Sequence, residues 1–275
     1  MGAAAAGIVA SGCLFAPQAE GSILFWDSFE YGDERDNIQD VSDWETGSGV
    51  IYYEPDEGLT HPGLQAEAGG AVLHDFGSGN RGFNRNINID VLQEGAAGVG
   101  DEFWFAGLIQ LANHDGTTRI RWDNESIVNP IGFGTNDAGN AILHASEDGA
   151  GSADLDTGIS VAADGSTYLF LVRAEVGPGD DSDRQGEVDF WFDPQDTSSV
   201  AALGSPDYTA TDSKFGRGDN AFDEITVNFS FQSRVDEFRM GTTLDSVIIA
   251  EPASLALLGL GGLLLVRRRR EQQRD

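Results

Sequence analysis

The sequence is poor in cysteine and in positive charge. It has a single cysteine, Cys13, so no intrachain disulfide can form. It has one lysine, Lys214, and 16 basic residues in all against 46 acidic ones, which gives a formal net charge of −30. A chain this acidic is repelled by a phosphate backbone, and nucleic acid is therefore excluded as a partner. Self-repulsion at this charge keeps a protein soluble. So acidic a composition also suits the binding of divalent cations or a salty medium.

The motifs of several enzyme classes are also missing. The chain has no Gly-x-Ser-x-Gly nucleophile elbow and no glycine-rich phosphate loop. Its four histidines form no His-x-x-His or Glu-x-x-His pair, which argues against a zinc site, and we expect each of them on the surface or in a loop. These histidines are His61, His74, His114 and His144.

Helical periodicity is absent from the central part of the chain, residues 21–249, where no segment keeps a 3.6-residue apolar stripe for three turns. Apolar and polar residues alternate instead in short runs bounded by glycine, aspartate and asparagine, which is typical of strands. The predicted strands cover residues 23–29, 50–53, 71–76, 102–111, 117–122, 131–133, 168–176, 187–192, 224–231 and 234–240. About a dozen strands with glycine-rich turns favour an all-β sandwich of two antiparallel sheets in a single domain.

The one long apolar stretch lies near the C-terminus. The segment Glu251, Pro252, Ala253, Ser254 precedes it, and the segment Arg267, Arg268, Arg269, Arg270 follows it. A helix over residues 253–266 would be about 21 Å long at 1.5 Å per residue, against roughly 30 Å of bilayer hydrocarbon. The four arginines would keep its end on the cytoplasmic face. The stretch is thus a marginal permanent anchor but long enough for a transient one.

These parts together resemble the PEP-CTERM sorting signal of bacteria that make extracellular polysaccharide. The resemblance covers residues 250–275, and Ala250 stands where that signal usually has its first proline. It implies that a membrane-embedded protease, exosortase, recognises the tail at the inner membrane. The protein would then reach the cell surface or the extracellular matrix, in contact with extracellular polysaccharide. An ordinary C-terminal anchor with a chance Glu-Pro is the alternative.

The N-terminus agrees in part with export. Residues 1–20 are rich in alanine and glycine with an apolar centre, as in a signal peptide, but no lysine or arginine precedes the apolar region. The segment Ala10-Ser11-Gly12-Cys13 also resembles a lipobox, in which Cys13 would be acylated. We therefore expect a signal peptide at residues 1–20, with lipidation of Cys13 as the alternative.

Three short runs in the central part resemble the concanavalin A-like, laminin-G-like jelly roll. They cover residues 24–29, 186–194 and 235–241. In that fold the first and last strands are neighbours, and here the first and last predicted strands lie close to the two ends of residues 21–249. The resemblance implies a jelly-roll sandwich associated with polysaccharide.

Laminarinase-type hydrolases of this fold carry Glu-x-Asp-x-(x)-Glu on one strand. Glu187 and Asp189 match the first two carboxylates and share a strand face, but positions 191 and 192 are Trp191 and Phe192. Retaining hydrolysis needs a second carboxylate about 5 to 5.5 Å from the first, as nucleophile and acid. We therefore expect a structural strand with residues 188, 190 and 192 facing inward. The alternative is a glycan hydrolase that obtains a third carboxylate from elsewhere.

Calcium is the metal that the sequence fits best. Asp181, Asp183 and Glu187 are hard oxygen donors close together, and residues 181–186 copy the first half of a calcium loop. The twelfth position of that loop is Phe192 rather than glutamate, so a solvated acidic hairpin is the alternative.

The sequence thus predicts an exported, non-catalytic protein that associates with polysaccharide. A glycan site would use aromatic platforms, and we expect most of the large aromatic residues to be in the core instead. The candidates are Trp44, Tyr52, Tyr53, Trp104 and Trp122. The two alternatives are a glycan hydrolase and a purely structural or adhesion component.

Overall fold

The computed structural model describes most of the central part of the chain. The described residues are 22–31, 34–46, 51–65, 70–74, 81–89, 101–114, 116–123, 130–146, 153–177, 186–213, 222–229 and 232–248. The predicted signal peptide, Cys13, Asp181, Asp183 and the C-terminal tail lie outside these ranges. Within the ranges, no helix is long and apolar enough to cross a bilayer.

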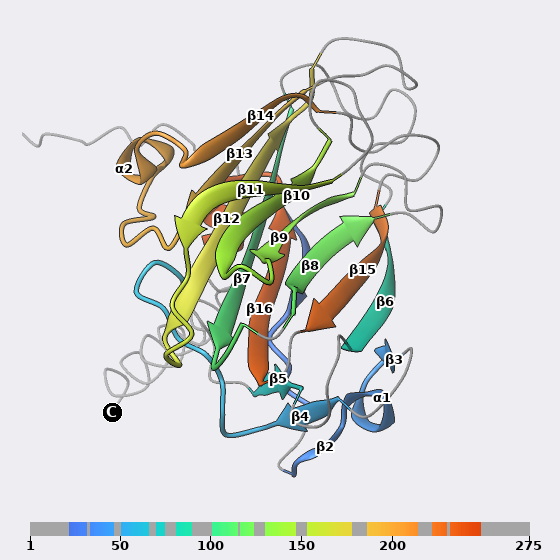
Figure 1. Cartoon of the computed structure of the whole chain (residues 1–275). Helices are drawn as coiled ribbons and strands as arrows, with labels where there is room; N and C mark the ends of the chain where they lie inside the picture. Colours follow the sequence, from blue (N-terminus) through green and yellow to red (C-terminus); the bar gives the residue numbers. More distant parts are fainter. Residues whose placement is uncertain are drawn as a thin grey trace, which may run out of the picture.

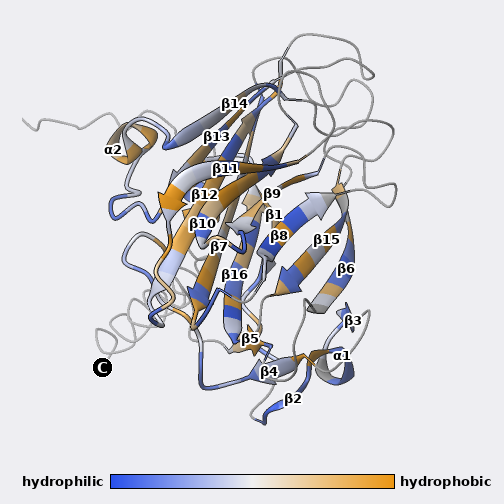
Figure 2. Cartoon of the chain, viewed as in Figure 1, coloured by the Kyte–Doolittle hydropathy of each residue, from blue (hydrophilic) through white to orange (hydrophobic). Residues whose placement is uncertain are grey.

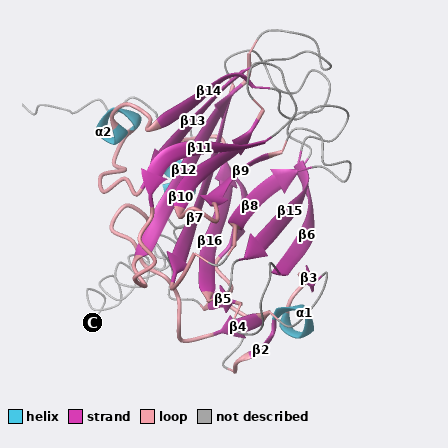
Figure 3. Ribbon diagram, in the orientation of Figure 1, coloured by secondary structure: helices cyan, strands magenta, loops and turns pink. Residues whose placement is uncertain are grey.

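The strands form two antiparallel sheets (Figures 1 and 3). Sheet A has the order β14 (Tyr208–Ser213), β13 (Gly186–Phe192), β12 (Thr167–Glu175), β7 (Glu102–Leu111), β16 (Ser233–Gly241), β5 (Ala71–Leu73), β4 (Tyr52–Glu54) and β2 (Asp36–Asn37), and β1 (Ile23–Asp27) also pairs with β16. Sheet B has the order β11 (Ala153–Ser160), β10 (Asn140–Ala145), β9 (Ile131–Thr135), β8 (Thr118–Asp123), β15 (Phe222–Phe229), β6 (Arg81–Ile89) and β3 (Glu45–Thr46). The predicted all-β sandwich of two antiparallel sheets is confirmed.

The helices in the described residues are short and peripheral (Figure 3). They are α1 (Ile38–Val41), α2 (Val200–Leu203) and α3 (Leu244–Ile248). The first and last strands are paired, as the resemblance implied, with Ile23 opposite Gly241 and Asp27 opposite Phe238. This pairing brings the two ends of the sandwich sequence together.

The strand predictions are accurate where apolar residues dominate. The strand predicted over residues 102–111 has these same bounds as β7. The strands β6, β10, β11 and β14 were not predicted, because glycine, asparagine and aspartate, which are depleted in strands, interrupt or flank their apolar residues. Their ladders to neighbouring strands hold them in the sheets.

The space between the sheets is filled mainly by aromatic and aliphatic side chains. Phe133 of sheet B stacks on Phe170 of sheet A with ring centroids 5.5 Å apart, and Trp122 lies 5.0 Å from Phe105. Such pairs add about 0.5–1.5 kcal/mol each to the burial of their apolar area. The inner core therefore holds the sheets together without disulfides.

The outer face of sheet A carries a second apolar cluster. There Trp104, Leu108 and Leu171 pack with Leu244 and Val247 of α3. Sheet A is therefore buried on both faces along its central strands. On sheet B, polar and apolar residues alternate along β6, β8 and β15 (Figure 2), and in the view of Figure 1 no described helix lies over its outer face.

Candidate functional site

Glu187 and Asp189 lie on the outer face of sheet A. In the register of β12 and β13, Glu187 is opposite Glu175 and Asp189 is opposite Arg173. The alternate residues Val188 and Phe190 are fully buried in the inner core, and Phe192 packs against that core. The predicted inward face of this strand is confirmed.

Arg173 connects these carboxylates to a third one. Its Nε lies 3.1 Å from Asp189 Oδ2, its Nη1 lies 3.2 Å from Glu102 Oε1, and its Nη2 lies 3.6 Å from Glu187 Oε1. Thr209 donates a further hydrogen bond of 2.6 Å to Asp189, which is only 3% exposed. We call Arg173, Asp189, Glu187 and Glu102 the Arg173 cluster.

Electrostatics in the Arg173 cluster favour charged groups. Burial opposes the charge on Arg173, but the hydrogen bond and charge of Asp189 outweigh it and raise the pKa of Arg173. Asp189 and Glu102 lie within hydrogen-bond distance of the guanidinium, and Glu187 lies 3.6 Å from it. The arrangement is thus that of an ion-pair network.

No local sequence pattern marks Glu102 and Arg173 as members of this cluster. They belong to β7 and β12, and the registers Arg173 to Trp104 and Glu175 to Glu102 bring them beside Asp189. At the position where a hydrolase of the laminarinase type would carry its further carboxylate, Trp191 is buried and stacks on Trp104 at 5.7 Å.

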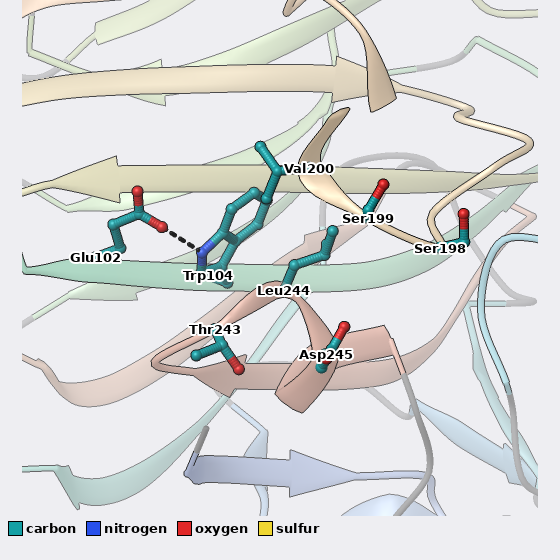
Figure 4. Close-up of a pocket in the computed structure, with 8 residues that line it drawn as sticks. All are labelled: Glu102, Trp104, Ser198, Ser199, Val200, Thr243, Leu244 and Asp245. Carbon is teal, nitrogen blue, oxygen red and sulfur yellow. Dashed lines mark hydrogen bonds between the residues drawn. The ribbon is translucent and has the colours of Figure 1, made fainter. Parts of the chain in front are cut away.

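A pocket of about 340 Å³ lies beside the Arg173 cluster on the same face of sheet A (Figure 4). It is lined by Glu102, Trp104, Ser198, Ser199, Val200, Thr243, Leu244 and Asp245, and we call it the Trp104 pocket. Trp104 donates a hydrogen bond of 3.1 Å from Nε1 to Glu102 Oε2, which fixes the orientation of the Glu102 carboxylate at the edge of the pocket. The lining combines two carboxylates and three hydroxyls with the apolar side chains of Val200 and Leu244.

The outer face of sheet B carries a second group of polar side chains, which we call the sheet B face. One row across six strands consists of Asn84, Thr226, Arg121, Gly132, His144 and Asp154. A parallel row consists of Asn228, Arg119, Gly134, Ile142 and Asp156, in which Ile142 is apolar and buried. These polar side chains alternate with buried apolar ones such as Ile120, Val227 and Leu143.

Close strand packing requires glycine at two positions of the sheet B face. A Cβ on Gly134 would lie 1.9 Å from the Thr118 carbonyl oxygen, and one on Gly132 would lie 2.9 Å from Arg121 Cγ. The stem of Arg121 therefore occupies the space above Gly132. Only glycine allows so close an approach at these two positions.

His144 and Asp154 form a hydrogen-bonded pair on this face. His144 Nδ1 lies 2.6 Å from Asp154 Oδ1, and Arg119 makes an ion pair with the same carboxylate. Burial lowers the pKa of His144, and the nearby charges of Arg119 and Arg121 add to this, against the opposing effect of Asp154. The neutral imidazole therefore donates from Nδ1 to Asp154 and keeps Nε2 as an acceptor.

The structure corrects one expectation and tests others in part. His144 lies in β10 and is 6% exposed, so it is neither a surface nor a loop histidine; the pairing with Asp154 allows its burial. Four of the five candidate aromatic residues are buried, as expected, and Tyr52 is partly exposed with the Arg35 guanidinium 4.3 Å from its ring centroid. These four residues are Trp44, Tyr53, Trp104 and Trp122.

The predicted calcium loop can be followed only at Glu187, because Asp181 and Asp183 lie outside the described residues. Within those residues, no group of three or more histidine, cysteine, aspartate or glutamate side chains could hold a metal ion. Glu187 is engaged by Arg173 at 3.6 Å. The calcium site therefore stays a prediction.

Comparisons with known proteins identify no family for this chain. No family model matches, and no curated protein matches. The chain shows partial backbone similarity to a carbohydrate esterase from the Shiga toxin-encoding bacteriophage phi24B, at 15% identity over 81% of this chain and 99% of that one, with a TM-score of 0.46.

Two further solved structures have lower scores. The carbohydrate-binding module CBM66 from Bacillus subtilis is 13% identical over 71% of this chain and 91% of its own, with a TM-score of 0.35. A β-1,3-1,4-glucanase from a mouse hindgut metagenome is 11% identical over 80% of this chain and 98% of its own, with a TM-score of 0.39. At these values, none of the similarities assigns an activity to the chain.

Proposed function

We propose that the chain is an exported, non-catalytic protein of a bacterial envelope or extracellular matrix that binds polysaccharide on the sheet B face. The observation that carries the proposal is the row from Asn84 to Asp154, which crosses six strands and has a polar side chain at every position except Gly132. Five inter-strand spacings of about 4.8 Å make this row about 24 Å long. A site of this length suits an extended polymer.

The chemistry of the sheet B face also suits sugar hydroxyls. Amide, guanidinium and carboxylate groups offer paired donors and acceptors, and Asn228, Arg121 and Asp156 supply one group of each kind. Positively charged arginines and negatively charged carboxylates lie on the same face, so neither sign of charge dominates it. We expect hydrogen bonds to neutral hydroxyl groups to provide most of the recognition.

The Arg173 cluster supports the non-catalytic part of the proposal. Asp189 is buried and holds hydrogen bonds from Arg173 and Thr209, and Trp191 occupies the place of a further carboxylate. The alternative function is a glycan hydrolase that uses Glu187 and Asp189 with Glu102 as the third carboxylate. Release of reducing ends from a polysaccharide by the wild-type chain, and its loss in Glu187→Gln, would favour that alternative.

Glycan binding can be measured with the full chain on a glycan array, with and without Ca²⁺. In the variant Thr226→Ala/Asn228→Ala we expect at least a tenfold loss of affinity, because two side chains that hydrogen-bond the ligand are removed, and tenfold corresponds to about 1.4 kcal/mol. Asp164→Asn, in the exposed turn between β11 and β12 and outside both rows of the face, is the matched control. Failure to bind any glycan in either condition would favour the purely structural alternative.

We further propose that exosortase cleaves the tail at residues 250–275, after recognition of Glu251 to Ser254 and of the four arginines. The tail lies outside the described residues, so this part depends on the sequence alone. The chain should be expressed in cells with and without exosortase, and its C-terminal mass measured. An intact arginine-rich end in both cells would refute the sorting proposal and leave an ordinary anchor.

A further inference from the structure

The Trp104 pocket is not used by the proposed function of the sheet B face. It lies on the outer face of sheet A, whereas the sheet B face is the outer face of the other sheet. Its volume of about 340 Å³ is at the small end of the range of ligand sites, roughly 300–1,000 Å³. The space is enough for one sugar ring or a molecule of similar size.

The polar groups of the pocket are held in place before any ligand arrives. Glu102 accepts from Trp104 Nε1 at 3.1 Å and faces Arg173 Nη1 at 3.2 Å, so its carboxylate has a fixed orientation. A carboxylate has about four lone-pair sites, and these two contacts leave acceptor capacity for a ligand. Trp104 is held in turn by its stacking on Trp191. A fixed acceptor lowers the entropy cost of binding.

The rim of the pocket adds an apolar contact and a second acceptor. Val200 is 45% exposed and is the one large apolar side chain with this exposure in the described part of the chain. It lines the cavity together with Leu244 and the exposed carboxylate of Asp245 (Figure 4). An apolar wall beside hydroxyl and carboxylate acceptors matches a sugar ring, which has C–H faces and hydroxyl edges.

Charge limits the class of ligand further. Among the described residues that line the pocket there is no arginine, lysine or histidine, whereas Glu102 and Asp245 both belong to them. A sulfate or a uronate carboxylate would face the carboxylate of Asp245 and that of Glu102, the latter paired with Arg173, and the net charge of −30 adds long-range repulsion. Hydroxyl and ammonium groups can donate to both carboxylates.

We infer that the Trp104 pocket is a second glycan site, which takes one non-anionic sugar ring, neutral or amino-bearing. The inference depends on the proposed function in taking a glycan as the ligand, but it names a different site and a smaller ligand. With the two sites on opposite faces of the sandwich, one molecule would bridge two glycan chains.

The test is a calorimetric titration of the full chain with glucose, glucosamine and glucuronate. We expect glucose and glucosamine to bind and glucuronate to bind at least tenfold more weakly. Asp245→Asn keeps the shape of the side chain and should weaken glucosamine binding at least fivefold, whereas the distant exposed control Asp164→Asn should not change it. Three results would overturn the inference: glucuronate binds as tightly as glucose and glucosamine, Asp245→Asn and Asp164→Asn change glucosamine affinity equally, or neither glucose nor glucosamine binds.

The same variants separate this inference from the proposed function. Thr226→Ala/Asn228→Ala should weaken polysaccharide binding and leave monosaccharide binding unchanged. If that variant behaves so and no monosaccharide binds, only the pocket inference fails. If monosaccharides bind and Asp245→Asn weakens them, while the sheet B variant leaves polysaccharide binding intact, only the proposed sheet B site fails.

Discussion

Arg173 should be essential for stability, because it is the cation that Asp189, Glu187 and Glu102 share. Arg173→Met removes the charge and keeps most of the apolar stem. Breaking a buried ion pair from one side costs about 3–5 kcal/mol. We expect about 3 kcal/mol, the lower end, because Arg173 itself is 19% exposed and Glu187 can turn toward water.

This loss corresponds to a clear change in thermal stability. For a domain of 150–250 residues, 1 kcal/mol shifts Tm by roughly 2–4 °C, so Arg173→Met should lower Tm by about 6–12 °C. Arg173→Met/Asp189→Asn removes both the guanidinium and the buried carboxylate charge of Asp189, so this double variant should regain part of the stability that Arg173→Met loses. Arg35→Met is the matched control, since Arg35 pairs with Glu54 at the surface, where such a pair contributes only about 0–1 kcal/mol.

Urea unfolding of wild type and of Arg173→Met, Asp189→Asn, Arg173→Met/Asp189→Asn and Arg35→Met measures the free energies. An Arg173→Met loss no larger than that of Arg35→Met would refute the reasoning, as would a double variant that loses the sum of the two single losses. Either result would mean that Asp189 and Arg173 are not energetically coupled. Asp189 would then be available for chemistry, and the hydrolase alternative would gain support.

Three further predictions concern pH and packing. Because burial lowers the pKa of His144, the unfolded chain takes up the proton first as pH falls. In urea unfolding, the difference in free energy of unfolding between wild type and His144→Gln should be constant above pH about 6.5 and shrink below it. Burial, and after it the charge of Glu237, raises the pKa of Asp236. The stability that its protonated form contributes is therefore fully present below pH about 3.9 and is lost as pH rises above that value. We expect wild type to lose stability relative to Asp236→Asn as pH rises above about 3.9. Gly134→Ala should cost at least about 1–3 kcal/mol in urea unfolding, because its Cβ would force β8 and β9 apart, whereas the exposed Ser160→Ala should cost little; equal losses would contradict the packing argument.

The sequence predicted the architecture well because the strongest strands have clear patterns. Residues 102–111 and 187–192 were assigned close to their observed bounds, and the inward positions of Val188 and Phe190 followed from period two. The site was harder to predict. Glu102, Arg173 and Asp189 are far apart in the sequence, and only the register of three strands brings them together.

The difference between the two sheets was nonetheless present in the sequence. Strand β7, Glu-Phe-Trp-Phe-Ala-Gly-Leu-Ile-Gln-Leu, is almost continuously apolar, as expected for a strand buried on both faces. Strand β8, Thr-Arg-Ile-Arg-Trp-Asp, alternates polar and apolar residues, as expected for a strand with one solvated face. The alternation therefore indicates which sheet keeps an open polar surface. This contrast is a better guide to the proposed binding face than the Glu-x-Asp match on β13, whose carboxylates are paired with Arg173.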